Sequence, residues 1–441
     1  MTTADIETAV PGEHVANLCT VLDLVRSGTA VTRPELVRAS GLGRTVITQR
    51  VADLMSYGLL AEGELGPSTG GRAPRQLRFR SEAGRILVAE LGASSIAVGL
   101  TDLRGRMLAH REEPADIAQG PEVLLPRVEQ LFDELLGTEA GSSPLWGIGI
   151  GVPGPVEFAT GRPIAPPIMP GWDGYPVRDR LAERHRVPVW VDNEVNLMAL
   201  GELRGGLAQG AREFVYLKIG TGIGAGLVSD GILHRGAQGC AGDVGHVAVA
   251  QDSTVVCRCG NVGCLEALAG GAALSREATA AAREGRSTFL ADALTSAGHL
   301  DARDVARGAD HGDPVCLELL TRSGKLVGEM LATLVNFYNP SLILIGGGVA
   351  ASGDLFLATI RQTVYRRSLP LATRDLRLAR SPLDDKAGLT GAGFMVIDEL
   401  FSPQRLGSWV ESRTPAAGRN SSWSEFSQAG RVGLEPTTEA L

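Results

Sequence analysis

One stretch of the sequence brings together side chains that can bind a metal ion. Residues 243–266 read DVGHVAVAQDSTVVCRCGNVGCLE and contain one histidine and three cysteines, namely His246, Cys257, Cys259 and Cys264. A Cys-x-Cys-x4-Cys run with two internal glycines makes a tight loop that can turn three thiols toward one point, and the imidazole completes a Cys3His set. Three unconnected buried thiols are the alternative, but half of the six cysteines fall within eight residues. Because four protein ligands leave zinc no open position, the pattern predicts a structural zinc site and not a catalytic one.

The length and composition indicate a multidomain chain that is neither secreted nor embedded in a membrane. A chain of 441 residues with 44% hydrophobic content exceeds a typical domain and can form large cores. The first residues, MTTADIETAVPGEH, are polar and acidic, and no run of 18 apolar residues occurs. The other cysteines, Cys19, Cys240 and Cys316, are scattered, which suits a reducing compartment. We therefore expect a cytoplasmic protein without a membrane span.

Charge is distributed unevenly along the chain. The formal net charge is −8, which argues against indiscriminate nucleic-acid binding by the whole molecule. Residues 12–80 contain nine arginines and six acidic residues, a balance of +3, so the remainder carries −11. A small basic head on an acidic body is a reasonable arrangement for a regulator.

Residues 12–80 carry the pattern of a winged helix-turn-helix domain. Apolar residues between His14 and Arg26 follow helical spacing, a capping box at Thr32–Glu35 opens a short helix, and a further helix is predicted from Arg44 to Tyr57. The glycine-containing turn between the last two helices is typical of a helix-turn-helix. The chain that follows is interpreted as a two-stranded wing. Three short amphipathic helices also occur in protein-binding modules, so the helices alone leave that alternative open.

The second helix of this pair presents polar side chains on its first turns, and we predict that they contact bases. Arginine suits guanine and glutamine suits adenine in the major groove. The wing sequence Gly-Arg-Ala-Pro resembles a hook that inserts arginine into a narrow minor groove, although a solvated arginine-rich face is the alternative. One such head covers little DNA, so a homodimer is expected. The predicted DNA-binding residues are Arg44, Thr45, Thr48, Gln49 and Arg72.

The metal-binding stretch resembles the signature of the ROK family, which comprises repressors, open reading frames and sugar kinases. The family pattern is Glu-x-Gly-His, a spacer, and Cys-x-Cys-Gly-x-x-Gly-Cys-x-Glu. This sequence matches it except that Asp243 replaces the first glutamate. In the family, the acid before Gly-His, the histidine and the final glutamate contact sugar hydroxyls. The resemblance therefore implies sugar-binding roles for Asp243, His246 and Glu266.

Residues 192–196, Asp-Asn-Glu-Val-Asn, resemble the family pattern Glu-Asn-Asp-Ala-Asn, whose aspartate deprotonates the sugar hydroxyl in kinases. Glu194 stands at that position, after Asn193, as it does in xylose-repressor-like members of the family. The additional methylene moves the carboxylate by about 1 Å, and a displacement of that size can lower a rate by about 10²-fold. The resemblance implies that Asn193 and Glu194 bind sugar and that Glu194 is a vestigial base position. Solvated acids at a strand end are the alternative.

Two glycine-containing loops resemble the phosphate loops of the family's kinases to different degrees. Kinases carry Asp-x-Gly-x-Thr in the first loop, whereas this sequence has Glu90-Leu-Gly92-Ala-Ser94, so both polar positions have changed. The second loop, 218–226, is intact, and its glycines let backbone N–H groups approach an anion closely. A plain turn between strands is about equally compatible with that loop. We predict a vestigial nucleotide loop made by Gly220, Thr221, Gly222 and Gly224.

The resemblance also implies a domain organisation. A two-lobed α/β body of the actin-like (sugar kinase or ribonuclease H-like) fold should follow the mainly α-helical head. We expect lobe 1 to comprise residues 83–195 and 386–401, and lobe 2 to comprise residues 196–385 with the zinc loop. Residues 1–11 are expected to be a flexible arm. Residues 402–441 are rich in Ser, Gly and Arg without apolar periodicity, so we predict a disordered tail without function.

Three function classes are compatible with these features to different degrees. A sugar-responsive DNA-binding repressor accounts for the head, the altered first loop and the altered base. The alternative is an ATP-dependent sugar kinase with an added DNA-binding head. A zinc-stabilised interaction scaffold would leave the sugar-binding residues unexplained. We therefore expect no enzymatic activity, and expect operator DNA, a small sugar effector such as a xylose-like ligand, and a second copy of the chain, as a homodimer or dimer of dimers, as partners.

Overall fold

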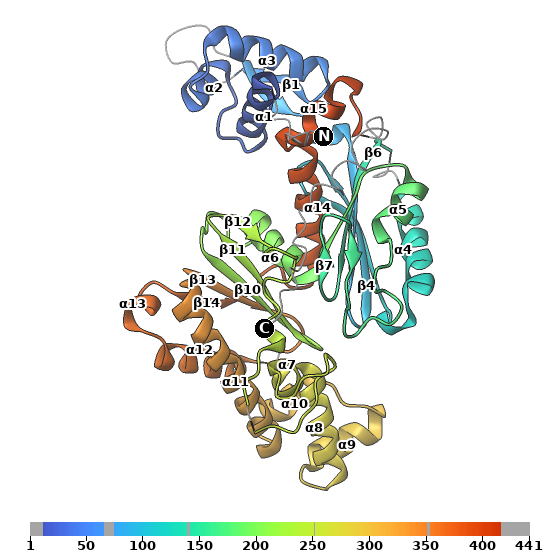
Figure 1. Ribbon diagram of the computed structural model, residues 1–441, viewed down its shortest axis with the longest axis vertical. Helices are drawn as coiled ribbons and strands as arrows, with labels where there is room; N and C mark the ends of the chain where they lie inside the picture. Colours follow the sequence, from blue (N-terminus) through green and yellow to red (C-terminus); the bar gives the residue numbers. More distant parts are fainter. Residues whose placement is uncertain (1–11, 66–74, 139–141, 251, 351–352, 416–441) are drawn as a thin grey trace, which may run out of the picture.

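The chain folds into a small head and two larger lobes (Figure 1). The head lies at the top of this view, lobe 1 to the right and lobe 2 below it to the left. The predicted arm, residues 1–11, lies outside the residues that the computed structural model describes, which are 12–65, 75–138, 142–250, 252–350 and 353–415. Within those ranges, no helix is long and apolar enough to cross a membrane.

The head consists of three helices and a two-stranded wing, as the sequence predicts. The capping box is confirmed, because the Thr32 hydroxyl accepts from the Glu35 N–H and the Glu35 carboxylate accepts from the Thr32 N–H. The helix that it opens ends at Gly41, whose φ of 71° is left-handed and suits glycine. The elements are α1 (Glu13–Arg26), α2 (Arg33–Ser40), α3 (Arg44–Ser56), β1 (Leu60–Leu65) and β2 (Arg75–Phe79).

Each lobe is built on a five-stranded mixed sheet, and the two sheets share one topology. Three successive antiparallel strands are followed by two strands that add in parallel beside the first. The orders are β5-β4-β3-β6-β9 in lobe 1 and β12-β11-β10-β13-β14 in lobe 2. This duplication, weak in the sequence, is plain in the backbone, and the two-lobed α/β fold is confirmed. The strands are β3 (Arg85–Leu91), β4 (Ser95–Asp102), β5 (Met107–Pro114), β6 (Leu145–Val152), β9 (Val189–Asn193), β10 (Phe214–Ile219), β11 (Ile223–Ser229), β12 (Ile232–His234), β13 (Leu342–Gly346) and β14 (Arg377–Arg380).

The sheet of lobe 1 is buried on both faces. In β3, Leu87 and Ala89 pack with the core that includes α4, whereas Ile86 and Val88 pack with the core that includes α14. Side chains alternate between the faces of a strand, so a continuous apolar strand requires cover on both sides. Figure 1 shows α4 and α5 on one side of the sheet and α14 on the other. The remaining elements of this lobe are α4 (Pro121–Leu136), α5 (Val177–His185), α14 (Ala387–Leu400) and the short pair β7 (Val156–Glu157) and β8 (Arg162–Pro163).

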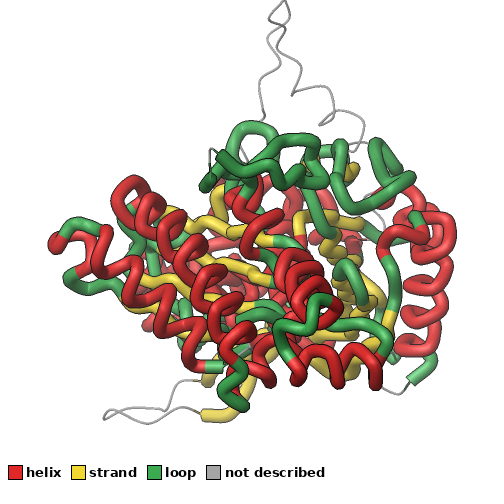
Figure 2. Tube along the Cα trace, turned by 90° about the horizontal axis from the view of Figure 1, so that it is seen from below, coloured by secondary structure: helices red, strands yellow, loops and turns green. Residues whose placement is uncertain are grey.

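Lobe 2 surrounds its sheet with helices. Figure 2 shows these helices in red outside the yellow strands. The longest, α11, is a 25-residue helix that packs against α12, α10 and α8. The helices are α7 (Leu265–Ala269), α8 (Gly271–Arg283), α9 (Thr288–Ala297), α10 (Ala302–Asp310), α11 (Pro314–Tyr338), α12 (Asp354–Arg367) and α13 (Pro370–Thr373).

Two helices pack against each other where the lobes meet. These are α6 (Glu194–Gly205) and α14. A Cβ atom added to Gly201 would overlap the carbonyl oxygen of Ala387, and one on Gly391 would overlap the carbonyl oxygen of Leu197. Glycine is therefore required at both positions for the two backbones to approach this closely. The connection between the lobes runs through this helix pair.

The prediction of a disordered tail from residue 402 is wrong for residues 402–415. This segment forms α15 (Pro403–Trp409) and a short 3-10 turn, and Leu406, Trp409 and Val410 are buried. The Trp409 indole N–H donates to the Leu400 carbonyl at 3.0 Å, and its ring meets that of Trp146 edge-on at 5.2 Å. Three apolar side chains in one short helix give too little periodicity to be recognised in a polar tail. Residues 416–441 lie outside the described part of the chain.

The head and lobe 1 share one hydrophobic core, which α15 completes. Phe401 meets Phe79 of the wing edge-on at 5.8 Å, and its carbonyl accepts from the Cys19 thiol of α1 at 3.6 Å. The Arg26 guanidinium lies 5.7 Å from the centroid of the Phe401 ring and 4.0 Å from the Asp398 carboxylate. The buried core cluster of the head continues through these side chains into that of lobe 1. These contacts join the head firmly to lobe 1.

Candidate functional site: a cavity between the lobes and a metal cluster beside it

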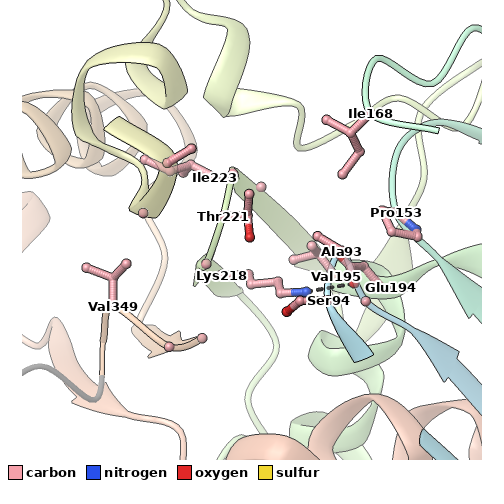
Figure 3. Close-up of a pocket in the computed structure, with 18 of the residues that line it drawn as sticks. Ala93, Ser94, Pro153, Ile168, Glu194, Val195, Lys218, Thr221, Ile223 and Val349 are labelled. Carbon is pink, nitrogen blue, oxygen red and sulfur yellow. Dashed lines mark ion pairs between the residues drawn. The ribbon is translucent and has the colours of Figure 1, made fainter. Parts of the chain in front are cut away.

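A cavity of about 700 Å³ lies between the two lobes. Lobe 1 contributes the end of β3, the loop after β6 and the start of α6, while lobe 2 contributes the loop after β10, the chain before α7, and residues 347–349. Figure 3 shows Pro153, Ile168 and Glu194 on one side of this space and Thr221, Ile223 and Val349 on the other. A ligand in the cavity would therefore contact both lobes at once.

The structure brings the predicted sugar-binding residues together in this cavity. Asn193 and Glu194 line it from lobe 1, and Asp243, His246 and Glu266 line it from lobe 2. The predicted nucleotide loop lies on the same surface, through Gly220, Thr221, Gly222 and Gly224. Segments about 70 residues apart in the sequence thus face one space.

Asn193 is held by the helix that it begins. As the N-cap of α6, its side-chain oxygen accepts from the backbone N–H groups of Val195 at 2.8 Å and Asn196 at 3.3 Å. Its amide nitrogen donates to the Gly154 carbonyl at 2.8 Å. A side-chain amide has two N–H hydrogens, so one remains for a ligand. The residue is thus first a helix cap, with a single donor left to offer to the cavity.

Glu194 forms an ion pair with a residue of the other lobe. The Lys218 ammonium lies 2.6 Å from Glu194 Oε2, and Figure 3 shows the lysine side chain reaching from β10 toward the start of α6. Burial lowers the pKa of Lys218, but the carboxylates of Glu194 and Glu90 outweigh it and raise the pKa above its usual value. Lys218 therefore remains an ammonium at neutral pH.

Glu90 is a third ionisable group at the same place. Burial raises the pKa of its carboxyl to about 8, despite the nearby Lys218. Within the described chain its Oε2 atom has no hydrogen-bond partner, and it lies against Gly388 at the start of α14, where a Cβ atom would overlap it. At neutral pH this carboxyl is mostly protonated, so the first loop offers an uncharged group where a metal–phosphate site needs an anion.

A second ion pair joins the lobes beside the first. The Arg235 guanidinium contacts the Asp192 carboxylate at 2.8 Å and stacks over the Phe158 ring at 4.0 Å. Asp192 also accepts from the Asn196 amide at 3.0 Å, and it is buried. Asp192 and Glu194 thus each bind a cation from lobe 2.

The lobe 2 side of the cavity is a set of loops in close contact. Glu266 Oε2 accepts from the Ile223 N–H at 3.1 Å, and a Cβ atom on Gly222 would overlap that carboxylate. A Cβ atom on Gly245 would similarly overlap the Ile223 carbonyl oxygen. Burial raises the pKa of the neighbouring Asp243 carboxyl. Glycines here allow loops from three parts of the chain to approach one another.

The predicted metal ligands form a compact group at the edge of this lobe. One donor atom each from His246, Cys257, Cys259 and Cys264 lies within 4.8 Å of all the others. The Cys259 and Cys264 sulfurs are 3.8 Å apart, and His246 Nδ1 is 3.7 Å from the Cys257 sulfur. A tetrahedral ion with metal–sulfur bonds of about 2.3 Å places its sulfurs about 3.8 Å apart, so the group fits a metal ion. His246 belongs to both the cavity lining and this cluster.

The predicted base-reading residues lie far from the cavity, on the head. Arg44, Thr45, Thr48 and Gln49 are all exposed on the first turns of α3. The Thr48 hydroxyl donates to the Arg44 carbonyl at 2.8 Å, and the Gln49 amide donates to Asp53 at 3.0 Å. Arg72 lies outside the described residues.

The sequence analysis did not identify the two cationic residues of lobe 2, Lys218 and Arg235, that pair with acids of lobe 1. Lys218 appeared there only as the first residue of a loop, and Arg235 had no assigned role. One signal was available, because the sequence contains three lysines among its 42 basic residues, and one of them stands beside a glycine-rich loop. The pairing itself needs the fold, which brings β10 against the start of α6.

Comparison with known proteins gives a consistent result. The model of the ROK family matches residues 87–399. A xylose repressor of Caldicellulosiruptor bescii is 31% identical over 88% of this chain and 96% of its own, and a glucokinase of Halalkalibacterium halodurans is 33% identical over 72% and 96%.

Among solved structures, too, the chain is similar both to a transcriptional regulator and to sugar kinases. A ROK family transcriptional regulator, a homologue of the E. coli MLC protein, aligns with a TM-score of 0.78 and 26% identity over 90% of this chain and 99% of its own. A ROK family glucokinase from Streptomyces griseus, in complex with glucose and AMPPNP, aligns with a TM-score of 0.63 and 28% identity over 71% and 99%. The regulators match more of the chain than the kinases do.

Proposed function

The chain belongs to the ROK family, and from this premise we propose that it is a sugar-responsive transcriptional repressor. Its head would bind operator DNA, and a sugar in the cavity between the lobes would release it. The observation that carries the proposal is the head itself, which shares a hydrophobic core with lobe 1 and exposes a polar face of α3. A repressor of this kind would act in the cytoplasm, where the DNA is.

The DNA-binding surface would be the start of α3 together with the wing. Arg44, Thr45, Thr48 and Gln49 would read base edges in the major groove, and Arg72 would enter the flanking minor groove. Half-sites one helical turn apart would then require two heads, and thus a homodimer or a dimer of dimers.

The ion in the Cys3His cluster would be zinc with a structural role. His246, Cys257, Cys259 and Cys264 would fill its four positions, and the ion would supply a cross-link with no open position for chemistry. The cross-link lies between Asp243 and Glu266, so it would fix the lobe 2 side of the cavity. With Nδ1 facing the thiols, Nε2 of His246 is the nitrogen left for a sugar hydroxyl.

The sugar would bind to both lobes and hold them together. Glu194 and the free N–H of Asn193 would contact hydroxyls from lobe 1, and Asp243, His246 and Glu266 would do so from lobe 2. A ligand shifts an equilibrium only when it binds one state better, and a polyol reaches both sets of groups only when the lobes are close. The repressor relatives suggest a xylose-like sugar.

Closure of the lobes would change operator affinity through the geometry of the dimer. Because the head contacts lobe 1 through α15 and Phe401, it would move with that lobe, and a change in the angle between the lobes would then change the spacing of two heads held in a dimer. Operator half-sites demand a fixed spacing. Couplings of about 1–3 kcal/mol are typical, so sugar should weaken operator binding by about 5- to 150-fold.

A sugar kinase remains the second candidate, because the glycine loop from Gly220 to Gly224 lines the cavity and glucokinases are among the relatives. Two features oppose it. Glu194 is paired with Lys218, and the carboxyl of Glu90, at the position of the kinases' first phosphate loop, is mostly protonated at neutral pH. A coupled assay with ATP, Mg²⁺ and a panel of sugars should detect no turnover near the 1–100 s⁻¹ that is roughly typical of kinases.

A gel-shift titration tests the proposed function directly. The full chain is titrated onto DNA from upstream of its own gene, alone and with D-xylose, D-glucose or other neutral sugars. The expected result is a specific complex that at least one sugar dissociates. A chain that binds no segment of this DNA, or a kinase-like turnover in the assay above, would contradict the proposal.

A further inference from the structure

Lys218 lines the cavity, and the proposed sugar contacts give it no role. Its side chain crosses from β10 of lobe 2 to the first residue of α6 and ends 2.6 Å from Glu194 Oε2. Only 18% of the lysine side chain and 11% of the glutamate side chain are exposed. The pair therefore forms the floor of the cavity and joins the two lobes there (Figure 3).

We propose that Lys218 is a positioning residue for the effector, and that the cavity takes an uncharged, hydroxyl-rich sugar in preference to a sugar phosphate. Lys218 holds the Glu194 carboxylate in one orientation by binding Oε2, and it leaves Oε1 to accept a sugar hydroxyl. The inference rests on the proposed function, because it assigns the ligand class and a further residue to the same cavity.

The first part of the argument is the hydrogen-bonding capacity of Glu194. An ionised carboxylate only accepts hydrogen bonds, and it has two oxygens. With the ammonium on Oε2, the remaining oxygen is held in place and can still accept a hydrogen bond. Without the ammonium, a largely buried carboxylate would be left beside Glu90 with no cation, and an uncompensated buried charge is costly. The carboxylate would then be free to turn away from the sugar, and its charge-assisted bond to a hydroxyl would be lost.

The second part is the charge of the cavity lining. Eight of its residues are aspartate or glutamate, and seven remain when the mostly protonated Glu90 is set aside, whereas its permanent cations are Lys218 and Arg303. Lys218 is engaged by Glu194, and Arg303 is exposed on α10. A sugar phosphate would bring about two negative charges into this acidic surface, where like charges repel. Neutral hydroxyls meet no such repulsion, and they match carboxylate acceptors well.

The neighbouring ion pair, Arg235–Asp192, can distinguish two possible roles of Lys218: positioning the Glu194 carboxylate, or only holding the two lobes together. Arg235 and Asp192 also join lobe 2 to the β9–α6 segment, at 2.8 Å, but neither lines the cavity. If Lys218 only held the lobes together, breaking either pair would have the same effect on sugar binding. If Lys218 positions Glu194, only its own loss should matter to the sugar.

The test is calorimetry on the full-length protein with D-xylose, D-glucose and D-glucose 6-phosphate. Lys218→Met should weaken binding of the preferred neutral sugar by about 10- to 100-fold, the loss of one hydrogen bond to a charged group. Arg235→Met should stay within about threefold of the wild type. In a Glu194→Gln background, adding Lys218→Met should change affinity by less than about threefold, because a residue that acts through Glu194 is not additive with it. Retained operator binding shows that each variant is folded.

The preference for a neutral sugar over a sugar phosphate can be tested with the wild-type protein alone. Wild-type protein should bind the neutral sugar at least about 10-fold more tightly than the 6-phosphate. Tighter binding of the phosphate, equal losses in Lys218→Met and Arg235→Met, or additive effects of Lys218→Met and Glu194→Gln would each overturn the inference. These outcomes leave the repressor proposal intact, whereas a wild-type protein that binds operator but none of the three ligands, or any other sugar, would remove both.

Discussion

The two sides of the cavity are fixed in different ways. On lobe 1, Asn193 and Glu194 lie where strand β9 passes into helix α6, so a parallel sheet, a helix cap and an ion pair position them. On lobe 2, Asp243 and His246 lie in the chain between β12 and α7, whose described residues form a 3-10 turn and two isolated bridges, and Glu266 lies in the first turn of the short helix α7. Regular structure fixes the first side, and a metal cross-link through the Cys3His cluster would fix the second.

This difference explains the position of the Cys3His cluster. Ordering a loop of this length without a ladder of hydrogen bonds costs conformational entropy, and three residues of the cavity lining depend on that order. A metal ion held by the four residues of the cluster, one of which also lines the cavity, would remove that freedom. Lobe 1, by contrast, is stabilised by two hydrophobic faces and by the head. We therefore expect damage to the metal site to affect sugar binding and to leave operator binding in place.

Loss of a metal ligand should give the largest effect. Cys259→Ser should abolish stoichiometric metal binding and weaken sugar binding by more than about 100-fold, because structural zinc can contribute on the order of 10 kcal/mol to local folding. Operator affinity should change little, because the head is attached to lobe 1. Metal analysis, calorimetry and gel shift on one preparation measure all three. Cys240→Ser, at an exposed cysteine outside the cluster, is the matched control. A metal-free protein with a normal sugar response would refute this view of lobe 2.

The opposite effect is expected from the junction of the head with lobe 1. Trp409→Ala removes a buried indole that contacts Trp146 and bonds the Leu400 carbonyl, and such truncations cost about 3–5 kcal/mol. Operator affinity and thermal stability should fall, while sugar affinity should be nearly unchanged. Trp423→Ala, in the part of the tail outside the described residues, is the control and should be silent. If Trp409→Ala impairs sugar binding as strongly as operator binding, the two functions are not divided between the regions as argued here.

A smaller effect is expected on the pH dependence of stability, through the buried carboxyl of Glu90 between the lobes. Burial raises the pKa of Glu90 to about 8, so the folded protein holds a proton that the unfolded chain releases near pH 4.5. The free energy of unfolding is therefore not reduced by this group below about pH 4.5. Between about pH 4.5 and 8 it falls as the pH rises, by at most about 1.4 kcal/mol per pH unit. Glu90→Gln, which cannot ionise, should lack this decline. Urea denaturation of both proteins at pH 5.5, 6.5, 7.5 and 8.5 measures the difference. Parallel stability curves would show that Glu90 is not buried as described.

Features that depend on neighbouring residues could be predicted from the sequence. The metal ligands were recognisable because three of them fall within eight residues, so their proximity is local. The capping box at Thr32 was recognisable because it too depends on neighbouring residues. Family resemblance placed Glu194 and Asp243 in one site, which the cavity lining now brings together.

What the sequence could not indicate depends on long-range packing. Lys218 and Glu194 are 24 residues apart and become partners only because β10 lies against the start of α6. Helix α15 is ordered only because Trp146 and α1 offer a surface for Leu406 and Trp409. In isolation its seven residues form a weak helix, since short helices are marginal without tertiary contacts.

The central claim is that one sugar, bound to both lobes, controls the head, and thermodynamic reciprocity tests it most directly. Operator affinity is measured with and without saturating sugar, and sugar affinity with and without operator, for the wild type and for Glu194→Ala. In the wild type we predict that both affinities weaken by one common factor of about 5- to 150-fold. Glu194→Ala should bind operator normally and show a factor near one. A wild-type operator affinity that no sugar changes, or a Glu194→Ala protein that sugar still releases, would contradict the account.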